Sequence, residues 1–245
     1  MLYGTGSIDG VAKRAPRVGS LDTEPLTLPG VELLRVTFEI ARRDVQTFFP
    51  PALQATLPPL VTWSVYRCKQ GPLGPFCLAE TQLNCRSGAR TRTYLLGGVI
   101  DSEKAGVALS ERWGFDPRIG EVRIHQGFDR VDATVVVERR RILEISMRDP
   151  VPLGPTAIHF APSMHPSNTS KGLRLLQVDT TFQVHRSERG RASVDCFSAD
   201  EWNEPRVRPT KSVAATFSTA DLTLEKLRFM GRPEVNAFEG TEPVC

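Results

Sequence analysis

Two side chains in apolar, strand-like segments have the chemistry to move protons. Glu80 follows Cys77-Leu78-Ala79, and if it points inward, burial raises its pKa into the range that suits general acid–base catalysis. If it points outward, it is an ordinary solvated carboxylate. His159 lies in Ala157-Ile158-His159-Phe160, where an imidazole could exchange protons near neutral pH. A structural histidine fits the same pattern, so both interpretations stay open.

The residue patterns that usually bind metals or nucleotides do not occur in this sequence. The five cysteines are odd in number and none are spaced as Cys-x-x-Cys, so we expect no zinc site and a reduced, cytoplasmic setting. The chain has no Gly-rich phosphate loop, no Gly-x-Ser-x-Gly elbow and no His-Glu-x-x-His motif. We therefore expect no metal and no cofactor. Asn168-Thr169-Ser170 is a glycosylation sequon by pattern, which we expect to be unused because no secretory signal precedes it.

Composition and net charge limit the kinds of partner that this protein can bind. The chain has 245 residues, is 40% hydrophobic and carries a net charge of only +3. Its one compact basic run, Glu138 to Arg141, is typical of a solvated hairpin turn, so we expect no nucleic acid. No apolar run reaches the roughly 18 residues of a membrane span. A small molecule is the partner that remains.

Short β-like runs separated by turn residues dominate the chain and must position these side chains. Strands are predicted over Val31–Ile40, Leu60–Cys68, Phe76–Cys85, Arg92–Ile100, Val122–Phe128, Asp132–Val137, Ile142–Met147, Thr156–Phe160, Leu173–His185, Ala192–Ser198 and Ser212–Leu224. Gly190 is predicted to form the turn between two of them. A short helix is predicted over Asp44–Phe49.

One principal helix is predicted between the strands. Asp101-Ser102 reads as its N-cap, Glu103 lies in the first turn, and Gly114 ends the helix after Trp113. Residues 1–20, rich in Gly, Ser and basic side chains, are expected to form a flexible arm. Residues 21–245 then form a single domain, mainly β (α+β), with a closed or nearly closed antiparallel sheet and few helices.

The serial order of several short motifs resembles the acetoacetate decarboxylase superfamily. The motifs are Pro50-Pro51-Ala52-Leu53, Pro59-Leu60-Val61, Leu73-Gly74-Pro75-Phe76, the strand that ends at Asp101, a helix, Glu111, and Trp113-Gly114-Phe115. The resemblance is strongest from Glu32 to Gly120 and continues in order to Leu224. It implies a closed antiparallel barrel or cone, a small-molecule pocket inside the sheet, and a homo-oligomer.

The resemblance breaks at the residues that carry the family's reaction. Members of the family form a Schiff base on a lysine that follows the helix, and a second lysine lowers its pKa. Here Pro117 and Arg118 take those two positions, and an arginine stays protonated. Ser64 takes the place of one family carboxylate, while Glu80 lies two residues beyond another. Conventional decarboxylation is therefore not expected.

The resemblance also assigns roles to residues around the pocket. Arg118 could clamp a carboxylate or enolate oxygen, or form an ion pair at a turn. Asp116 could act as an acid or base, or cap that turn. Glu111 could touch the substrate or anchor the helix. Candidate substrate-binding residues are Tyr66, Ser64, Trp113 and Phe115, although Tyr66 and Trp113 also suit core packing.

Two functions follow. The first is an enzyme, lyase-like in class, that acts on a small keto acid or polyketide-like molecule of secondary metabolism by acid–base chemistry without a Schiff base. It could be a lyase, hydratase, isomerase or cyclase, in which Arg118 stabilises negative charge while Glu80 or His159 moves protons. The second is a non-catalytic protein that binds a small molecule in the same pocket.

Overall fold

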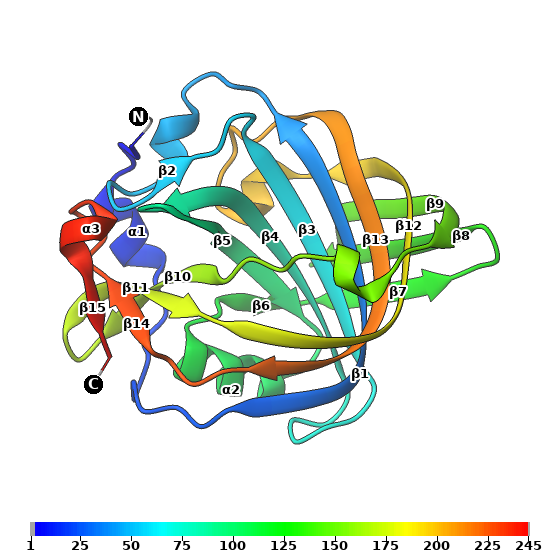
Figure 1. Ribbon diagram of the computed structural model, residues 1–245, viewed down its shortest axis with the longest axis horizontal. Helices are drawn as coiled ribbons and strands as arrows, with labels where there is room; N and C mark the ends of the chain where they lie inside the picture. The colour runs from blue at the N-terminus through cyan, green and yellow to red at the C-terminus, as the bar shows by residue number, and fades with distance from the viewer. Residues whose placement is uncertain (1–2, 245) are drawn as a thin grey trace.

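The computed structural model describes residues 3–244. Within that range, fifteen strands join one large mixed sheet (Figure 1). The strands are β1 (Leu26–Ile40), β2 (Gln54–Ala55), β3 (Leu60–Cys68), β4 (Phe76–Ser87), β5 (Arg90–Ile100), β6 (Pro117–Ile119), β7 (Glu121–Gln126), β8 (Arg130–Val137), β9 (Arg140–Pro152), β10 (Ser163–Thr169), β11 (Gly172–Val178), β12 (Thr180–Phe197), β13 (Pro209–Leu224), β14 (Phe229–Gly231) and β15 (Thr241–Pro243). The expected mainly β class with few helices is confirmed.

The sheet is neither closed nor wholly antiparallel, which corrects the expected barrel. Its strands follow the order β15-β14-β11-β10-β5-β4-β3-β1-β13-β12-β9-β8-β7, with β2 beside β4 and β6 beside β5. β10 and β6 both pair parallel with β5 because each reaches it through a crossover. The sheet stays open because β7 turns back against β3, β4 and β5 instead of pairing with β15.

The described residues contain three helices, α1 (Ile8–Arg14), α2 (Glu103–Trp113) and α3 (Ala237–Gly240). The short helix expected near Asp44 is a 3-10 turn over Val45–Phe48. The predicted ends of α2 are confirmed. The Ser102 hydroxyl accepts a hydrogen bond from the Ala105 backbone N–H, and Gly114 adopts a left-handed conformation with φ of 67°.

Side chains on β3 alternate between two sides of the curved sheet. Val61, Trp63 and Val65 are buried on one side, in a core that β7, β8 and β9 cover. Ser64 and Tyr66 face the other side, which α2 helps to cover. Figure 1 shows α2 below the sheet and the β7–β9 hairpins projecting at the right.

Two strand predictions and one turn prediction between residues 156 and 198 are wrong. Residues 156–160 form no strand, and the strand in this region is β10, whose polar sequence and Pro166 hid it. The run predicted over Leu173–His185 is broken at Asp179, between β11 and β12. Gly190 lies inside β12 and makes no turn. A Cβ there would lie 2.4 Å from the Arg148 carbonyl oxygen, so the position needs glycine for close packing against β9.

The N-terminal segment lies against the body of the molecule, unlike the loose arm that the sequence suggests. Val11 and Val18 are buried, and Arg14 donates a 2.6 Å hydrogen bond to the Asn203 carbonyl oxygen. The Asn168 side chain donates to the carbonyl oxygens of Ala12 and Ala15, at 3.2 and 2.8 Å. Its amide group is therefore engaged within the protein.

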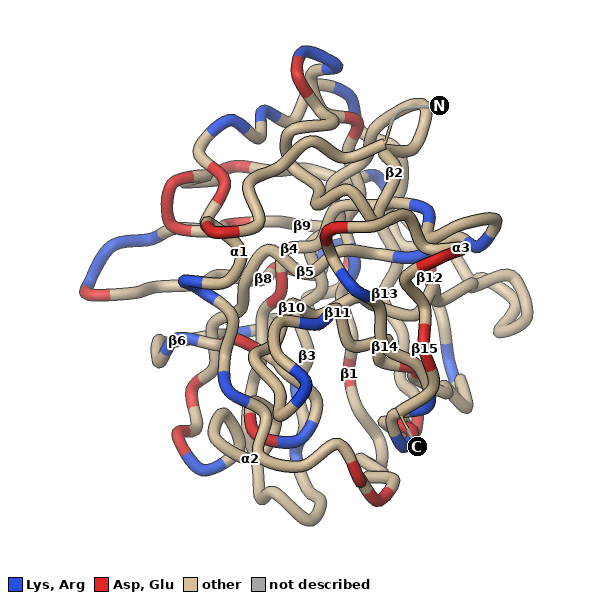
Figure 2. Tube along the Cα trace, turned by 90° about the vertical axis from the view of Figure 1, so that its left-hand side faces the viewer, with Lys and Arg blue, Asp and Glu red and all other residues tan. Residues whose placement is uncertain are grey.

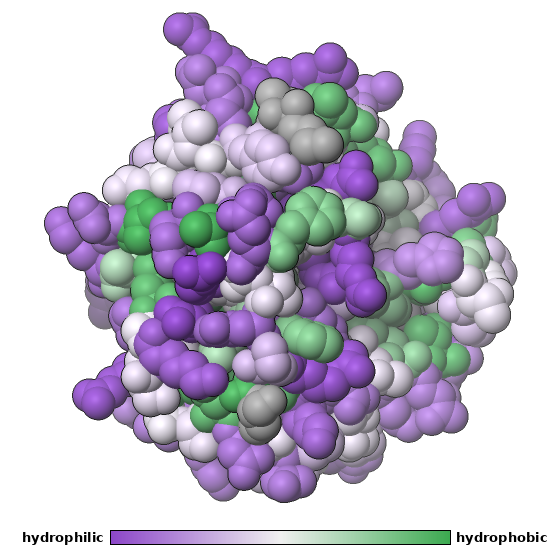
Figure 3. Space-filling view, turned by 60° about the vertical axis from the view of Figure 1, so that its left-hand side comes forward, coloured by the Kyte–Doolittle hydropathy of each residue, from purple (hydrophilic) through white to green (hydrophobic). Residues whose placement is uncertain are grey.

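Residues of both charge signs are interspersed along the Cα trace (Figure 2). The basic run is the expected hairpin turn between β8 and β9, with Glu138 and Arg139 in left-handed conformations. The face in Figure 3 carries hydrophobic side chains in small groups separated by hydrophilic ones. No helix among residues 3–244 has the length and apolar character needed to cross a membrane. The homo-oligomer stays a prediction.

Candidate active site

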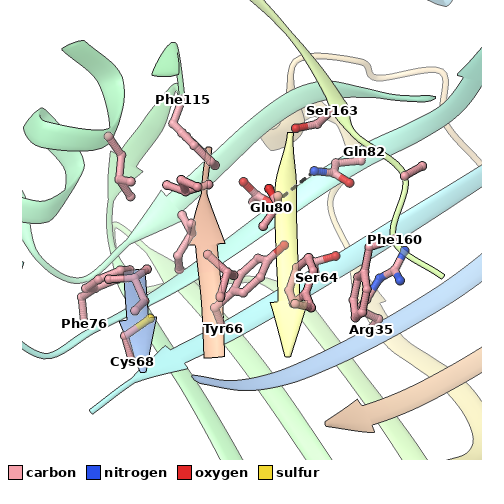
Figure 4. Close-up of a pocket in the computed structure, with 18 residues that line it drawn as sticks. Arg35, Ser64, Tyr66, Cys68, Phe76, Glu80, Gln82, Phe115, Phe160 and Ser163 are labelled. Atoms are coloured by element: carbon pink, nitrogen blue, oxygen red, sulfur yellow. Dashed lines mark hydrogen bonds between the residues drawn. The ribbon is translucent and has the colours of Figure 1, made fainter. Parts of the chain in front are cut away.

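A cavity opens on the side of the sheet that α2 helps to cover. Its volume, including the part that opens to solvent, is about 670 Å³. β1, β3 and β4 form its floor, and residues of α2, β12 and β13 and the segment before β10 form its walls. Most of the lining is apolar, with a few polar side chains that converge from the floor (Figure 4). Cavities of this size and character commonly bind small molecules.

Strand register places three polar residues in one row across the floor. Arg35 on β1 pairs with Ser64 on β3, and Ser64 pairs with Glu80 on β4. Directly opposed residues project from the same face of a sheet, so all three point into the cavity. Arg35 and Glu80 are two strands apart, which separates their backbones by about 10 Å. Both side chains line the same cavity, so a small acid bound there could contact the guanidinium and the carboxyl group together.

Glu80 is a buried carboxyl group with an unused oxygen. The residue is 2% exposed, and its Oε2 accepts a 3.1 Å hydrogen bond from the Gln82 side chain. Oε1 has no hydrogen-bond partner among the described residues. Burial raises the pKa of Glu80 to about 7, although the nearby Tyr66 phenol and Arg35 guanidinium oppose the rise. Glu80 can therefore exchange a proton near neutral pH.

Tyr66 and Arg35 are the other ionisable side chains that influence the pKa of Glu80. The Tyr66 ring extends from β3 toward Glu80 (Figure 4). Burial, and then the Glu80 charge, raise the pKa of Tyr66 well above its usual value, so the phenol keeps its proton. Burial lowers the pKa of Arg35, whose guanidinium donates to the His159 carbonyl oxygen at 3.3 Å and lies over the Phe160 ring. Among the described residues, Arg35 makes no ion pair with a carboxylate.

The cavity gathers four of the residues predicted from the sequence and one that was missed. Glu80, Ser64, Tyr66 and Phe115 all line it. Arg35 was missed, because a single arginine between Leu34 and Val36 looks like the exposed position of an alternating strand. The alternation along β1 did carry a signal, because it puts Arg35 on the same face of the strand as the apolar Leu33.

The other predicted site residues lie outside this cavity. Arg118 is exposed and donates to Glu201, with 3.0 Å between Nη1 and Oε2, so the ion-pair alternative describes it. That hydrogen bond lowers the pKa of Glu201. Asp116 lines a separate, smaller pocket together with Arg14, and burial raises its pKa.

His159, Glu111 and Trp113 do not contribute side chains to the cavity either. His159 and Glu111 are exposed on the surface. Trp113 is fully buried in the core behind α2, and its indole N–H donates to the Glu225 carbonyl oxygen at 2.9 Å. The structure therefore places Trp113 in the core, which was the alternative interpretation of this residue.

The row across the floor continues toward the position that the sequence resemblance assigns to the family's lysine. Glu80 pairs with Gly98 on β5, and Gly98 pairs with Pro117 on β6. A lysine at position 117 would start two strands from Glu80. Among the described residues, no lysine lines the cavity. Its lining includes the Glu80 carboxyl group, the Tyr66 phenol and the Arg35 guanidinium.

Comparisons with known proteins agree with this architecture. The profile of the family described as acetoacetate decarboxylase (ADC) matches residues 14–232. A search of curated proteins returns no significant match. An acetoacetate decarboxylase from Legionella pneumophila has a similar crystal structure, with a TM-score of 0.73 and 16% identity over 89% of this chain and 93% of that one.

Two further solved structures share the fold. The enduracididine biosynthesis enzyme MppR, complexed with pyruvate, matches with a TM-score of 0.70 and 16% identity, over 87% of this chain and 97% of that one. An acetoacetate decarboxylase-like enzyme from Sphingomonas wittichii RW1 matches with a TM-score of 0.64 and 10% identity, over 84% and 92%. At these identities, the structural likeness establishes the fold alone.

Proposed function

This chain belongs to the acetoacetate decarboxylase family, and from that premise we propose that it is an enzyme that moves a proton on a small keto acid without forming a Schiff base. The observation that carries the proposal is the row of Arg35, Ser64 and Glu80 on the cavity floor. The row places a group that can bind a carboxylate and a group that can transfer a proton on the same cavity floor, on strands two spacings apart.

Each group of the row has a role that its chemistry supports. The Arg35 guanidinium binds the substrate carboxylate with two N–H donors. The Glu80 carboxylate removes a proton from the carbon next to the ketone, through its unused Oε1. The Tyr66 phenol donates a hydrogen bond to the enolate oxygen as negative charge develops there. Protonated Glu80 then returns its proton to the product.

Enolisation is the step that isomerases, hydratases, cyclases and lyases acting beside a ketone have in common. We therefore propose proton transfer by Glu80 as the step that these reactions share. A lyase-like reaction is one of the reactions that can follow it. A keto acid as substrate is supported by MppR, a similarly folded enzyme whose structure was solved with pyruvate. A buried carboxyl group with a pKa of about 7 suits proton transfer near neutral pH, which supports an enzyme over a non-catalytic binding protein.

Hydrogen exchange on pyruvate tests the proposal directly. In D2O, the protein should catalyse the loss of the pyruvate methyl signal in proton NMR, and Glu80→Gln should slow that loss by about 100-fold or more, since general bases contribute on that order. Glu234→Gln, which alters an exposed carboxylate, is the matched control. Undiminished exchange by Glu80→Gln would refute the role of Glu80.

The pH profile and borohydride treatment test the same mechanism separately. The base must be deprotonated, so kcat/KM for exchange should rise with pH and level off above about 7. Borohydride added with pyruvate should leave every lysine unmodified. A reduced pyruvate adduct on any lysine would overturn the Schiff-base-independent mechanism.

A further inference from the structure

Ser163, in the cavity lining, and the buried His165 form a hydrogen-bonded pair that the proposed proton transfer does not use. Ser163 lines the cavity at the start of β10, and its Oγ lies 2.7 Å from Nε2 of His165. His165 is completely buried two residues further on, so the two side chains project from the same side of β10. Its Nδ1 lies 2.9 Å from the Trp113 carbonyl oxygen. The three groups form a continuous chain that begins at the cavity.

The chain fixes where the protons are. A carbonyl oxygen can only accept, so Nδ1 of His165 carries the hydrogen that bonds to Trp113. Burial lowers the pKa of His165 to about 4, so the ring is neutral at neutral pH and Nε2 has a free lone pair. The Ser163 hydroxyl therefore donates to Nε2. Its oxygen lone pairs are left for a molecule in the cavity.

The segment after α2 holds the imidazole in this orientation. The Trp113 carbonyl oxygen anchors one nitrogen, and the Phe115 ring meets the imidazole edge-on with centroids 4.5 Å apart. Gly114 between them brings the backbone so close to β10 that a Cβ would lie 2.0 Å from Ser167 Oγ. The ring is thus fixed from two sides, as a base that serves a nucleophile requires.

We propose that Ser163 is a nucleophile activated by His165, and that the cavity therefore has a second activity, the hydrolysis of small activated esters or thioesters. The arrangement matches the serine–histidine part of hydrolytic triads, with a backbone carbonyl in the orienting role that a carboxylate usually has. The apolar cavity walls suit a short acyl chain. The Arg35 guanidinium supplies N–H donors to the same cavity.

The reaction balances with water as the only co-reactant. Ser163 Oγ bonds to the acyl carbon while its proton passes to His165 Nε2, and that proton then leaves with the alcohol or thiol. Water next attacks the acyl-serine, again giving its proton to Nε2, which returns it to Ser163 as the carboxylic acid departs. This activity goes beyond the proposed keto acid chemistry and does not depend on it.

Covalent labelling with an alkyl fluorophosphonate, mapped by peptide mass spectrometry, tests the nucleophile in the unaltered protein. The label should be found on Ser163 and not on Ser64, a serine that lines the same cavity without a histidine partner. Ser163→Ala should abolish labelling and the acyl-enzyme burst with p-nitrophenyl acetate. His165→Gln should slow labelling by about 100-fold or more.

Ser187→Ala is the control, because Ser187 is buried outside the cavity, where its hydroxyl donates to the Leu153 carbonyl oxygen, and it should label normally. If Ser163 stays unlabelled, or if Ser64 is labelled instead, the proposal is overturned. This result comes from the unaltered protein and does not depend on the folding of any variant. Labelling requires no keto acid and hydrogen exchange requires no nucleophilic serine, so each proposal can fail while the other stands.

Discussion

At the scale of single residues, the environment of Glu80 links activity to stability. A carboxyl group with a usual pKa near 4.5 has one of about 7 here, because the folded protein withholds water from it. Between these two values the folded state binds more protons than the unfolded state. Stability therefore falls as pH rises through this window, and the full penalty is present above about pH 7.

Glu80→Gln should relieve that penalty. At pH 8 the variant should be more stable than the unaltered protein by on the order of 3 kcal/mol, the free energy equivalent of this pKa difference. Near pH 5, where the carboxyl group is mostly protonated in the fold, the gain should shrink toward zero. Urea unfolding at both pH values measures it. A gain of equal size at pH 5 and pH 8 would show that ionisation of Glu80 is not its cause.

At the scale of elements, the junction of α2 with β10 depends on one glycine. Gly114 ends α2 with φ of 67°, and its Cα faces Ser167. A side chain at this position meets two obstacles, the left-handed backbone and the close approach of β10. The second obstacle distinguishes Gly114 from other glycines with positive φ.

Gly114→Ala and Gly30→Ala separate the two obstacles. Gly30 has φ of 61° with open space around it, so its substitution should cost about 1 kcal/mol from backbone strain alone. Gly114→Ala adds a Cβ that displaces Ser167 Oγ and lies 3.2 Å from Ser167 Cβ, so it should cost about 2 kcal/mol. Chemical denaturation gives both values. Similar losses at the two positions would mean that the close approach contributes nothing.

At the scale of the whole molecule, the N-terminal segment is fastened to β10 by Asn168. Besides its two side-chain hydrogen bonds, its backbone N–H donates to the Pro16 carbonyl oxygen, and its own carbonyl oxygen accepts from Val18. The segment covers the small pocket that contains Asp116 and Arg14. Figure 1 shows both chain ends at this side of the molecule.

Asn168→Ala should loosen that segment while the sheet stays intact. Losing the side-chain hydrogen bonds should cost about 1 to 2 kcal/mol locally, and so raise trypsin cleavage after Lys13, Arg14 and Arg17 by roughly tenfold. Limited proteolysis followed by mass spectrometry measures the rate. Ser170→Ala, an exposed change nearby, should leave the rate unchanged. Equal cleavage of both variants would mean that Asn168 does not anchor the segment.

Local features of the sequence predicted local structure well and long-range geometry poorly. The capping signals at Ser102 and Gly114 predicted α2, and alternation predicted β3 to the residue. The functional row could not be predicted in the same way, because strand register sets Arg35, Ser64 and Glu80 side by side from three separate strands. Arg118 was misplaced for the same reason, since its partner Glu201 lies 83 residues further along the chain.

The turn after α2 has a consequence for how enzymes of this kind are identified in genomes. Trp113 contributes a carbonyl oxygen and a side chain that packs in the core. Gly114 has no side chain, which lets β10 approach closely. The core side chain and the glycine serve the scaffold whichever reaction occurs in the cavity, while the Trp113 carbonyl oxygen also orients His165 in the hydrolysis proposed above. If the proposed mechanism holds, a search with Trp113-Gly114-Phe115 should collect proteins by architecture, and Glu80, Arg35 and the residue at position 117 should distinguish them by chemistry.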